Sequence, residues 1–493
     1  MSDAGKHLNQ HLEEFLETFQ IPSVSVTVYR DPQRTASCDS PYQHFNAGYK
    51  DLEHSLCAGP DTMYAIGSCT KSFTAAAIGV LCDRGLLNLE DPVRKYIPEF
   101  EMYDPYAGAH LTVRDMLCHR CGLPRHEVSW YPRLDTYTEA DMIRILRYLK
   151  PNAPFRYKMQ YQNLMFTLAG FVIERVSGTS WENFLKENIT DPLGLGYVAF
   201  DAPDLAAAKD PAVGYRFNDK SGHNEKVEYA TLNTMRAAGS ISLTSHQLAQ
   251  WDAMFLHNGS YEGKQILSEE ICREMCSPQM LISDPVIEPL QGYVEMQSYG
   301  LGLFTECYRG VRILHHGGHI DGFIADQCFV PSRGLAFTVL TNSENAFGAR
   351  AMRYTLLDRY LELEPVDWIG RFHQFSQKRK EQAASQKRPD PQLSIQYPCP
   401  VSLDEIAGEY MDMGYGSITV TACDGRLVIR MGTLTLDGVH VRAQHFLLTE
   451  EHVLPGELLE AEVEMDKEGN AAAFLIALES TSAEKIRFVR VKH

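Results

Sequence analysis

The sequence predicts a large mixed α/β region followed by a small all-β domain, and three observations support this fold class. Residues 21–29 alternate as a half-buried strand, and residues 300–304 and 335–341 have strand character much later in the chain. The long middle between them is mainly helical in pattern, and residues after 400 form closely spaced short strands with tight turns. We therefore expect the two ends of the first region to form one sheet, with the middle packed over it as helices.

Apolar residues at helical spacing predict the helices of this region. An amphipathic helix at the start of the chain would place on one face Leu8, Leu12, Phe15, Leu16 and Phe19. Further helices are expected from near Ser68 to Leu81, from Leu164 onward, and over Ser268–Cys276 and Ala351–Leu363.

A charged, Pro-rich segment divides the chain. Residues 371–400 lack an apolar period and are rich in Lys, Arg, Gln and Pro, as is typical of a linker with a solvated surface. We therefore expect a large α/β domain over residues 1–370, a linker over 371–400 and a β-rich domain over 401–493.

Short strands separated by turn residues predict an antiparallel barrel or sandwich for the last domain. Turns are expected at Asp424-Gly425, Asp437-Gly438 and Glu468-Gly469. The strands are expected over Ser417–Thr421, Arg426–Met431, Val439–Arg442, His445–Thr449, Glu460–Met465, Ala473–Leu478 and Ile486–Val491.

Composition excludes several classes of function. The 493 residues are 44% hydrophobic and carry a net charge of -18, which argues against nucleic-acid binding and against attachment to anionic lipid. The chain start lacks the features of a secretory signal, and no apolar run approaches the roughly 20 residues that span a bilayer. The 12 cysteines are scattered, as in a protein of a reducing compartment. We expect a cytoplasmic protein, and a small or neutral substrate fits its acidic composition.

Ser68 and Lys71 are the first candidates for chemistry. They are three residues apart where a helix is expected to begin, so the lysine amine can reach the serine hydroxyl. A helix N-terminus and burial both disfavour an ammonium ion, as a base for acyl transfer requires. The spacing alone is weak, because a capping serine beside a solvated lysine would give the same pattern.

Two further groups of residues bear on this pair. Tyr161 and Asn163 stand at the expected start of an apolar helix, where a core tyrosine and a helix cap would be the ordinary interpretation. The segment His315-His316-Gly317-Gly318-His319-Ile320-Asp321-Gly322-Phe323 follows the strand-like residues 311–314. By itself it predicts a turn, and its glycines would allow a close approach to the strand edge.

The sequence contains cysteine and histidine clusters that could bind a metal ion, but their spacing does not favour a metal site. Cys118-His119-Arg120-Cys121 offers three ligands without a second half-site, and Cys272 and Cys276 are the nearest alternative. The three histidines near His316 include neighbours that would point to opposite faces of a strand. We expect no metal and no cofactor.

In this order, Ser68-x-x-Lys71, Tyr161-x-Asn163 and His316-Gly317-Gly318 resemble the motifs of the serine β-lactamase and penicillin-recognising enzymes. The resemblance is to the branch with class C β-lactamases, D-amino-acid peptidases and carboxylesterases, and it covers about residues 8 to 350. Five other segments are similar to that family: residues 45–53, 89–100, 111–117, 178–181 and 191–195. The resemblance implies an antiparallel sheet flanked by helices, with an all-helical lobe.

The resemblance also implies a role for each motif residue. Ser68 would be the acylated nucleophile, Lys71 its base and Tyr161 the second proton-transfer group. Asn163 would hold the substrate amide, the strand His316-Gly317-Gly318 would line the substrate, and His319 would give a backbone N–H to the oxyanion hole. The β-rich domain resembles the lipocalin-like domains of some D-amino-acid peptidases, where it shapes the site entrance or the oligomer. A homo-oligomer is therefore allowed.

Departures from the family pattern narrow the expected activity. His316 stands where β-lactam-binding members have a lysine, so a titratable imidazole replaces the fixed charge that receives a substrate carboxylate. We therefore expect a serine hydrolase acting on an amide or ester of a small molecule or short peptide, including one with a D-residue, rather than a strong β-lactamase. Two alternatives stay open: an acyltransferase that uses the same acyl-enzyme, and a binding or scaffold protein without turnover.

Overall fold

The computed structural model describes residues 3–34, 40–385, 395–450 and 458–492, which form two compact units. The sheet unit consists of Met1–Pro98, His110–Cys121 and Asn163–Ser376. The barrel unit consists of Glu99–Ala109, Gly122–Gln162 and Gln377–His493. The barrel unit thus includes a segment taken from the middle of the first region, Gly122–Gln162, which we call the connecting segment.

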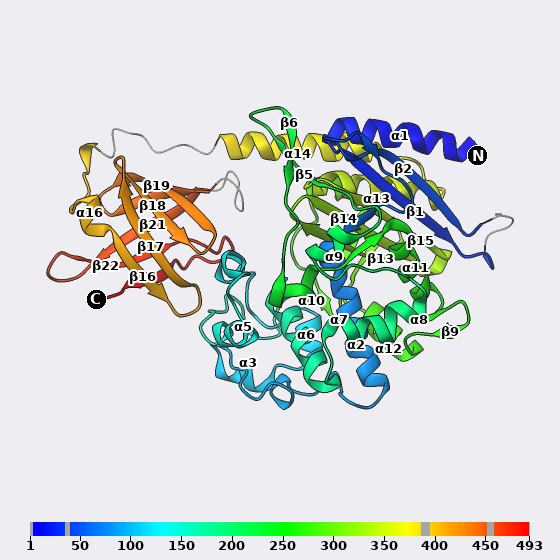
Figure 1. Ribbon diagram of the computed structural model, residues 1–493, viewed down its shortest axis with the longest axis horizontal. Coiled ribbons are helices and arrows are strands. Elements are labelled where there is room, and N and C mark those ends of the chain that lie inside the picture. Colours follow the sequence, from blue (N-terminus) through cyan, green and yellow to red (C-terminus); the bar gives the residue numbers. More distant parts are fainter. Residues whose placement is uncertain (1–2, 35–39, 386–394, 451–457, 493) are drawn as a thin grey trace. The chain divides into compact units, whose positions relative to one another are not determined.

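A nine-stranded sheet forms the centre of the sheet unit (Figure 1). The first strand of the chain pairs antiparallel on one side with its neighbour in sequence and on the other with the last strand of the region, as predicted from the two ends. In spatial order the strands are β10 (Met280–Leu281), β11 (Val294–Tyr299), β12 (Phe304–Tyr308), β13 (Val311–Ile320), β14 (Phe323–Val330), β15 (Leu335–Thr341), β1 (Ser23–Arg30), β2 (Tyr42–Asp51) and β3 (Leu56–Cys57).

Helices cover both faces of this sheet because its strands alternate in chemistry. On one face Val24, Val26 and Val28 belong to a buried apolar cluster that includes residues of α1 (Asp3–Phe19), α13 (Ala346–Tyr360) and α14 (Trp368–Ala384). On the other face Thr27 of the same strand bonds through its hydroxyl to Ser245, the first residue of α11 (Ser245–Leu256), at 2.8 Å. One apolar and one partly polar face therefore give a sheet between two helical layers.

The remaining helices and short strands complete the two units. In the sheet unit the remaining helices are α2 (Thr70–Asp83), α4 (Val113–Leu117), α6 (Asn163–Ser177), α7 (Trp181–Leu185), α8 (Asp191–Leu193), α9 (Ala202–Ala207), α10 (Arg236–Gly239) and α12 (Glu269–Cys276). Three two-stranded sheets accompany them: β4 (Met63–Ala65) with β7 (Ser242–Thr244), β5 (Gly214–Asn218) with β6 (His223–Val227), and β8 (Ser260–Tyr261) with β9 (Lys264–Gln265). The barrel unit includes α5 (Glu139–Leu146) and α16 (Leu403–Ile406), and α3 (Pro105–His110) ends at its boundary.

One prediction about the sheet region was wrong, and another was correct only for the end of its segment. Residues 300–303 are a loop rather than a strand, because Gly302 has a φ of +77° and a side chain there would collide with the backbone of Lys71. The turn predicted within residues 315–323 lies at the end of that segment, at Asp321-Gly322, whereas the histidines and Gly317-Gly318 belong to β13, which continues to Ile320.

The C-terminal domain is a closed antiparallel barrel of eight strands (Figure 1, orange to red). Sequence patterning missed the first strand, which closes the barrel by pairing with the last. It also misplaced one turn: Asp437 and Gly438 lie inside a strand, whereas Asp424-Gly425 is a turn as predicted. The strands are β16 (Gly408–Asp412), β17 (Gly416–Cys423), β18 (Arg426–Met431), β19 (Leu434–Arg442), β20 (His445–Thr449), β21 (Leu458–Met465), β22 (Ala471–Ile476) and β23 (Ile486–Arg490).

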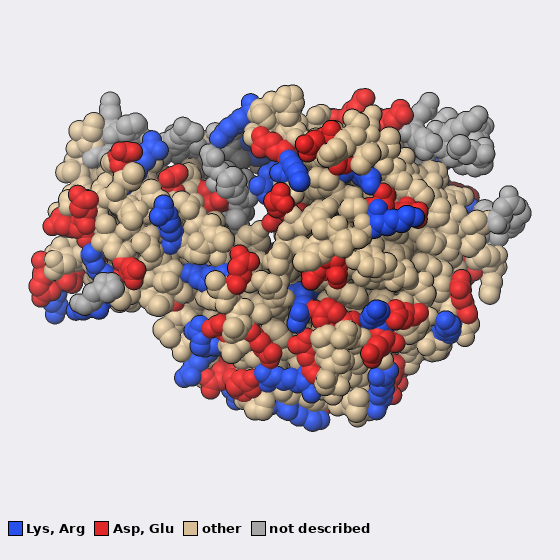
Figure 2. All heavy atoms as spheres, viewed as in Figure 1, with Lys and Arg blue, Asp and Glu red and all other residues tan. Residues whose placement is uncertain are grey.

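The segment predicted as a linker is helical in its first half. Residues 371–384 belong to α14, and Lys378, Arg379 and Lys380 are exposed on it, while residues 386–394 lie outside the described residues. Figure 2 shows Lys and Arg side chains interspersed with Asp and Glu over the face drawn. Within the described residues, no helix is both long enough and apolar enough to cross a membrane.

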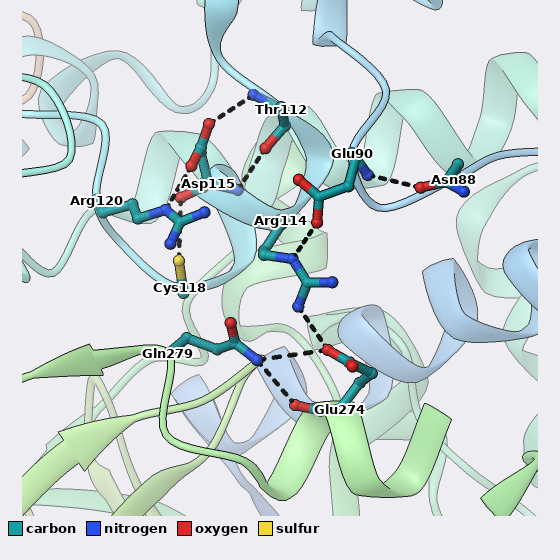
Figure 3. Close-up of polar contacts among 9 residues, drawn as sticks. All are labelled: Asn88, Glu90, Thr112, Arg114, Asp115, Cys118, Arg120, Glu274 and Gln279. Atoms are coloured by element: carbon teal, nitrogen blue, oxygen red, sulfur yellow. Dashed lines mark hydrogen bonds and ion pairs between the residues drawn. The ribbon is translucent and has the colours of Figure 1, made fainter. Parts of the chain in front are cut away.

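Ion pairs fix the segment that follows α4 (Figure 3). Thr112 and Asp115 form a reciprocal capping box at the start of this helix, and the buried Asp115 also bonds to Arg120. Arg114 joins Glu90 and Glu274, each at 2.5 Å, and so ties α4 to α12. These contacts give Arg120 and Arg114 a structural role in the sheet unit.

Candidate active site

Ser68 and Lys71 meet at the start of α2. Ser68 lies in a single 3-10 turn, Gly67–Cys69, directly before the helix, and its side chain is half-buried. The Lys71 Nζ donates to the Ser68 Oγ at 3.0 Å. The short helical spacing therefore brings together an amine and a hydroxyl within direct proton-transfer distance.

The surroundings of Lys71 are mainly apolar. Its side chain is 0% exposed, although lysine is rarely buried in this way. The Nζ donates to the carbonyl oxygen of Ala238 on α10 at 2.7 Å and lies 5.6 Å from the centre of the Phe166 ring on α6. Three elements of the sheet unit thus fix the amine against the serine.

The backbone of β13 lies directly against the turn that carries Ser68. A Cβ atom on Gly318 would lie 1.8 Å from the carbonyl oxygen of Ile66 and 3.1 Å from the Ser68 nitrogen. On the facing turn, Gly67 has a φ of +49°, and a Cβ there would lie 2.8 Å from the His319 nitrogen. Only glycine fits both positions, so the two glycines place the backbone of His319 beside the serine turn.

His316 is a buried neutral imidazole. It is 1% exposed, its Nδ1 lies 2.7 Å from the Gly317 carbonyl oxygen and its Nε2 lies 3.0 Å from the Tyr299 hydroxyl. A carbonyl can only accept, so Nδ1 carries the proton and Nε2 accepts from Tyr299. Burial first, and the nearby Lys71 second, hold the pKa of His316 well below its usual value of 6.5. No fixed positive charge therefore arises at this position.

The other residues predicted on this strand have different exposures. Gly317 and the His319 side chain are exposed, whereas Gly318 is buried against the serine turn. The carbonyl oxygen of His316 accepts from the Cys69 thiol at 3.2 Å, which gives a second tie between β13 and the turn. Asn163 is half-buried and is the first residue of α6, the helix that also supplies Phe166.

Tyr161 belongs to the barrel unit, at the end of the connecting segment and two residues before Asn163. Its side chain is half-buried. The guanidinium carbon of Arg125, from the start of the same segment, lies 5.1 Å from the centre of the Tyr161 ring. A positive charge so close favours the phenolate over the phenol.

A small pocket lies within the sheet unit, and Ala65, two residues before the serine turn, is one of its lining residues. Its walls include Ala65, Ser240, Ile320, Asp321 and Phe323, and it has room for little more than a water-sized group below an open mouth. Ser240 is 8% exposed, and its hydroxyl has no hydrogen-bond partner among the described residues. The pocket is therefore partly apolar, with a buried hydroxyl available to a ligand.

Among the cysteines and histidines that were candidate metal ligands, the structure shows buried thiols, contacts with aromatic rings and a contact with a carboxylate. Cys118 and Cys121 are buried thiols, and the His119 ring packs on the rings of Phe166 and Tyr299, with centres 5.1 and 4.7 Å apart. His315 faces Glu306, with its Nε2 3.1 Å from the carboxylate. Within the part of the chain that the structure describes, no group of three or more His, Cys, Asp or Glu side chains could hold a metal ion.

Several residues that build this site were not found from the sequence. Ala238, Tyr299 and Gly302 approach Ser68, Lys71 or His316 from distant parts of the chain, and two of them act through backbone atoms. No side-chain pattern signals such a carbonyl or such a close approach.

Comparison with known proteins gives one family and several relatives. Residues 8–361 match the family model described as Beta-lactamase. Unguisins hydrolase ungD' of Aspergillus campestris is 27% identical over 440 residues, which cover 85% of this chain and 78% of that protein. The counterpart ungD of Aspergillus violaceofuscus is 28% identical over 451 residues, 84% of this chain and 76% of that protein.

Two solved structures share the fold. The octameric penicillin-binding protein homologue from Pyrococcus abyssi is 20% identical with a TM-score of 0.63, and the match covers 99% of this chain and 100% of that one. The D-amino acid amidase from Ochrobactrum anthropi, complexed with D-phenylalanine, is 22% identical with a TM-score of 0.59, over 73% of this chain and 99% of that one. The first likeness extends across the barrel as well as the sheet.

Proposed function

This chain belongs to the beta-lactamase family, and we propose that it is a serine hydrolase that works through an acyl-enzyme on Ser68. The observation that carries the proposal is the 3.0 Å contact between the Ser68 hydroxyl and the fully buried Lys71 amine. A fully buried lysine side chain is unusual, because burial disfavours the charged ammonium form. It is expected where an amine must exchange a proton.

The proposed reaction has two halves. In the first, neutral Lys71 takes the Ser68 proton while the Ser68 Oγ forms a bond to the substrate carbonyl carbon, and the carbonyl oxygen becomes an oxyanion that accepts from the backbone N–H groups of Ser68 and His319. The bond to the leaving group then breaks, and Tyr161 supplies the proton that the departing amine or alcohol needs. In the second half, a water molecule gives a proton to the Tyr161 phenolate as its oxygen bonds to the acyl carbon. The ester bond to the Ser68 Oγ then breaks, Lys71 returns its proton to that oxygen, and the acid is released.

We propose a small amide or ester substrate, including short peptides with a D-residue. The neutral His316 leaves the site without the charge that would receive a β-lactam carboxylate. The small pocket lined by Ala65 and Ser240 would accept only a small acyl-side group. Relatives named as unguisins hydrolases and a fold neighbour that is a D-amino acid amidase agree with hydrolysis of amides.

A fluorophosphonate probe tests the nucleophile. The parent should be labelled at Ser68, Ser68→Ala should not be labelled, and Lys71→Ala should be labelled more slowly by a factor of about a thousand. Equal labelling of all three proteins would refute the nucleophile assignment. A parent that is never labelled would favour the scaffold alternative.

A substrate panel separates the remaining alternatives. It would consist of p-nitrophenyl esters, D- and L-aminoacyl anilides and a chromogenic cephalosporin, and we expect the cephalosporin to be the poorest substrate. Adding a competing alcohol or amine distinguishes hydrolysis from acyl transfer, because both begin from the same acyl-enzyme. If the acceptor product dominates at low acceptor concentration, the enzyme is an acyltransferase.

We also propose that the protein acts in the cytoplasm, that residues 401–493 form a lipocalin-like domain, and that the chain forms a homo-oligomer. The octameric fold neighbour supports the last point, since its match includes the barrel. Sedimentation of the full chain tests it. A single species of 55.6 kDa would exclude the oligomer.

A further inference from the structure

In the barrel unit, His126, the residue after Arg125, is hydrogen-bonded to two residues that lie more than 280 positions later in the chain. Arg125 is half-exposed and pairs with Glu127 while its guanidinium lies beside the Tyr161 ring. The next residue, His126, is only 3% exposed and has a φ of +48°. This left-handed conformation costs free energy for any residue that carries a side chain, so the turn needs contacts that stabilise it.

Those contacts come from the barrel domain. The His126 backbone N–H donates to the Glu479 carboxylate at 2.8 Å. The His126 Nε2 lies 2.9 Å from the Lys150 carbonyl oxygen, which can only accept, so Nε2 carries the proton and Nδ1 accepts from the Tyr415 hydroxyl at 2.7 Å. Burial lowers the pKa of His126, which keeps the ring neutral in this arrangement.

Glu479 is itself firmly held. It is 5% exposed, and its carboxylate accepts from the Thr481 backbone N–H at 3.2 Å and from the Thr481 hydroxyl at 2.7 Å. Tyr415 is 2% exposed, and burial raises its pKa well above 10, so its hydroxyl stays a donor. The turn at His126 therefore rests on two fixed side chains rather than on solvent.

A second contact docks the same segment on the barrel. The Pro132 carbonyl oxygen accepts from the Thr433 backbone N–H at 2.9 Å, and the buried Arg133 donates to the Ser417 carbonyl oxygen at 2.6 Å. A Cβ on Gly432 would lie 1.9 Å from the Pro132 oxygen, so glycine is needed for this approach. The barrel thus holds the connecting segment by its backbone as well as by side chains.

We propose that the barrel domain sets the proton affinity of Tyr161 by holding Arg125 over its ring, with Glu479, Tyr415 and His126 as the positioning residues. The proposal rests on the role given above to Tyr161 as a proton-transfer group. A guanidinium fixed 5.1 Å from the ring centre stabilises the phenolate, whereas a guanidinium free to turn toward solvent would not. The carboxylates that also act on this turn are Glu127, Glu479 and Asp412.

Ultraviolet titration of the tyrosinate form tests the proposal without requiring turnover. The absorbance difference between each protein and its Tyr161→Phe counterpart isolates the titration of Tyr161. Arg125→Gln should raise the pKa of Tyr161 by about one unit, and Arg125→Lys, which keeps the charge, should raise it less. An unchanged pKa in Arg125→Gln would overturn the proposal.

Variants of Glu479 separate positioning from direct charge. Removing a carboxylate by itself lowers the pKa of a nearby phenol, whereas displacing Arg125 raises it. We therefore expect Glu479→Ala to raise the pKa of Tyr161 and Glu479→Gln, which keeps an acceptor oxygen, to raise it less. A lowered pKa in Glu479→Ala would mean a charge effect only and would contradict the positioning role.

The matched control is Glu484→Ala. Glu484 also joins the barrel to the connecting segment, through an exposed ion pair with Lys150 at 2.8 Å, but it does not touch His126. It should leave the pKa of Tyr161 unchanged. If Glu479→Ala fails to fold, Tyr415→Phe removes only the hydroxyl donated to His126 and should shift the pKa in the same direction; no shift there would overturn the proposal. Fluorophosphonate labelling of Ser68 in each variant reports separately on the proposed function.

Discussion

The two units hold their candidate catalytic groups by different means. In the sheet unit, Ser68 and Lys71 are fixed by backbone: a short helical spacing, a carbonyl oxygen and two glycines at a close approach. In the barrel unit, Tyr161 stands at the end of a segment whose other end is held by buried side chains of the barrel domain. The proposed nucleophile is thus built within one unit, whereas the proposed second proton-transfer group depends on side chains of the barrel domain.

This difference suggests how the two halves respond to change. Where two backbone segments lie in direct contact, an added side-chain atom must push them apart, whereas a change of charge nearby has little effect. We therefore expect steric substitutions to be the most damaging changes in the sheet unit. A buried polar network fails when one partner is removed, because the others are left unsatisfied. The predictions below use this contrast.

The largest effect is expected for Gly318→Ala. The new methyl would lie 1.8 Å from the Ile66 carbonyl oxygen and must push β13 away from the serine turn. We expect kcat/KM to fall at least about a thousandfold, as for loss of an oxyanion contact, with a clear loss of Tm. The control is Gly317→Ala on the same strand, where the nearest atom would be 3.9 Å away. Similar losses in both variants would show that strand strain, not the close approach, is responsible.

Sequence reasoning succeeded where the determinants are local. The helix after Ser68, the helix after Asn163 and the strand over residues 335–341 follow from spacing and composition in one window. The predictions were wrong at residues 300–303 and at Asp437-Gly438. In the first segment Gly302 lies against the backbone of Lys71, which is far away in sequence, and in the second Gly438 lies inside a pair of strands.

The barrel contacts were beyond sequence reasoning for a different reason. His126 and Glu479 are 353 positions apart, and neither lies in a motif. A buried histidine and a buried carboxylate have no periodic signature, and their pairing is fixed only once the barrel has closed. The motif residues of the candidate site were found through family resemblance, whereas the residues that position them were not.

Acid should destabilise the sheet unit through its buried histidines. Burial first, and then Arg353, lower the pKa of His315 from 6.5 to about 4. A lowered folded-state pKa gives stability that is complete above pH 6.5 and is lost as the pH falls through about 4, by about 3 kcal/mol for this shift. His315→Gln should remove this part of the pH dependence, measured as the Tm difference from the parent between pH 7 and pH 4. A constant difference across that range would contradict the assignment.

Gly432→Ala should distinguish the proposed proton-transfer role of Tyr161 from the proposed nucleophilic role of Ser68. A methyl there would meet the Pro132 carbonyl oxygen and weaken docking of the connecting segment on the barrel. We expect turnover to fall about tenfold while fluorophosphonate labelling of Ser68 continues at the parent rate. Gly425→Ala is the control, because its φ of +74° carries the same left-handed strain with nothing within 4 Å. It should cost about 1 kcal/mol of stability and leave turnover unchanged. Loss of labelling in Gly432→Ala would mean that the nucleophile also depends on the barrel.

The smallest effect is expected for Ser240→Ala in the small pocket lined by Ala65 and Ser240. The Ser240 hydroxyl is buried without a partner among the described residues, so its removal deletes no protein hydrogen bond. The free energy of unfolding should stay within about 1 kcal/mol of the parent or rise, since an unsatisfied buried polar group is lost. Substrates with a hydrogen-bonding acyl-side group should lose several-fold in kcat/KM, while purely apolar esters of the same size should not. Urea unfolding and a matched pair of esters measure the two outcomes, and a loss of several kcal/mol in stability would place Ser240 in the structural framework rather than in the binding pocket.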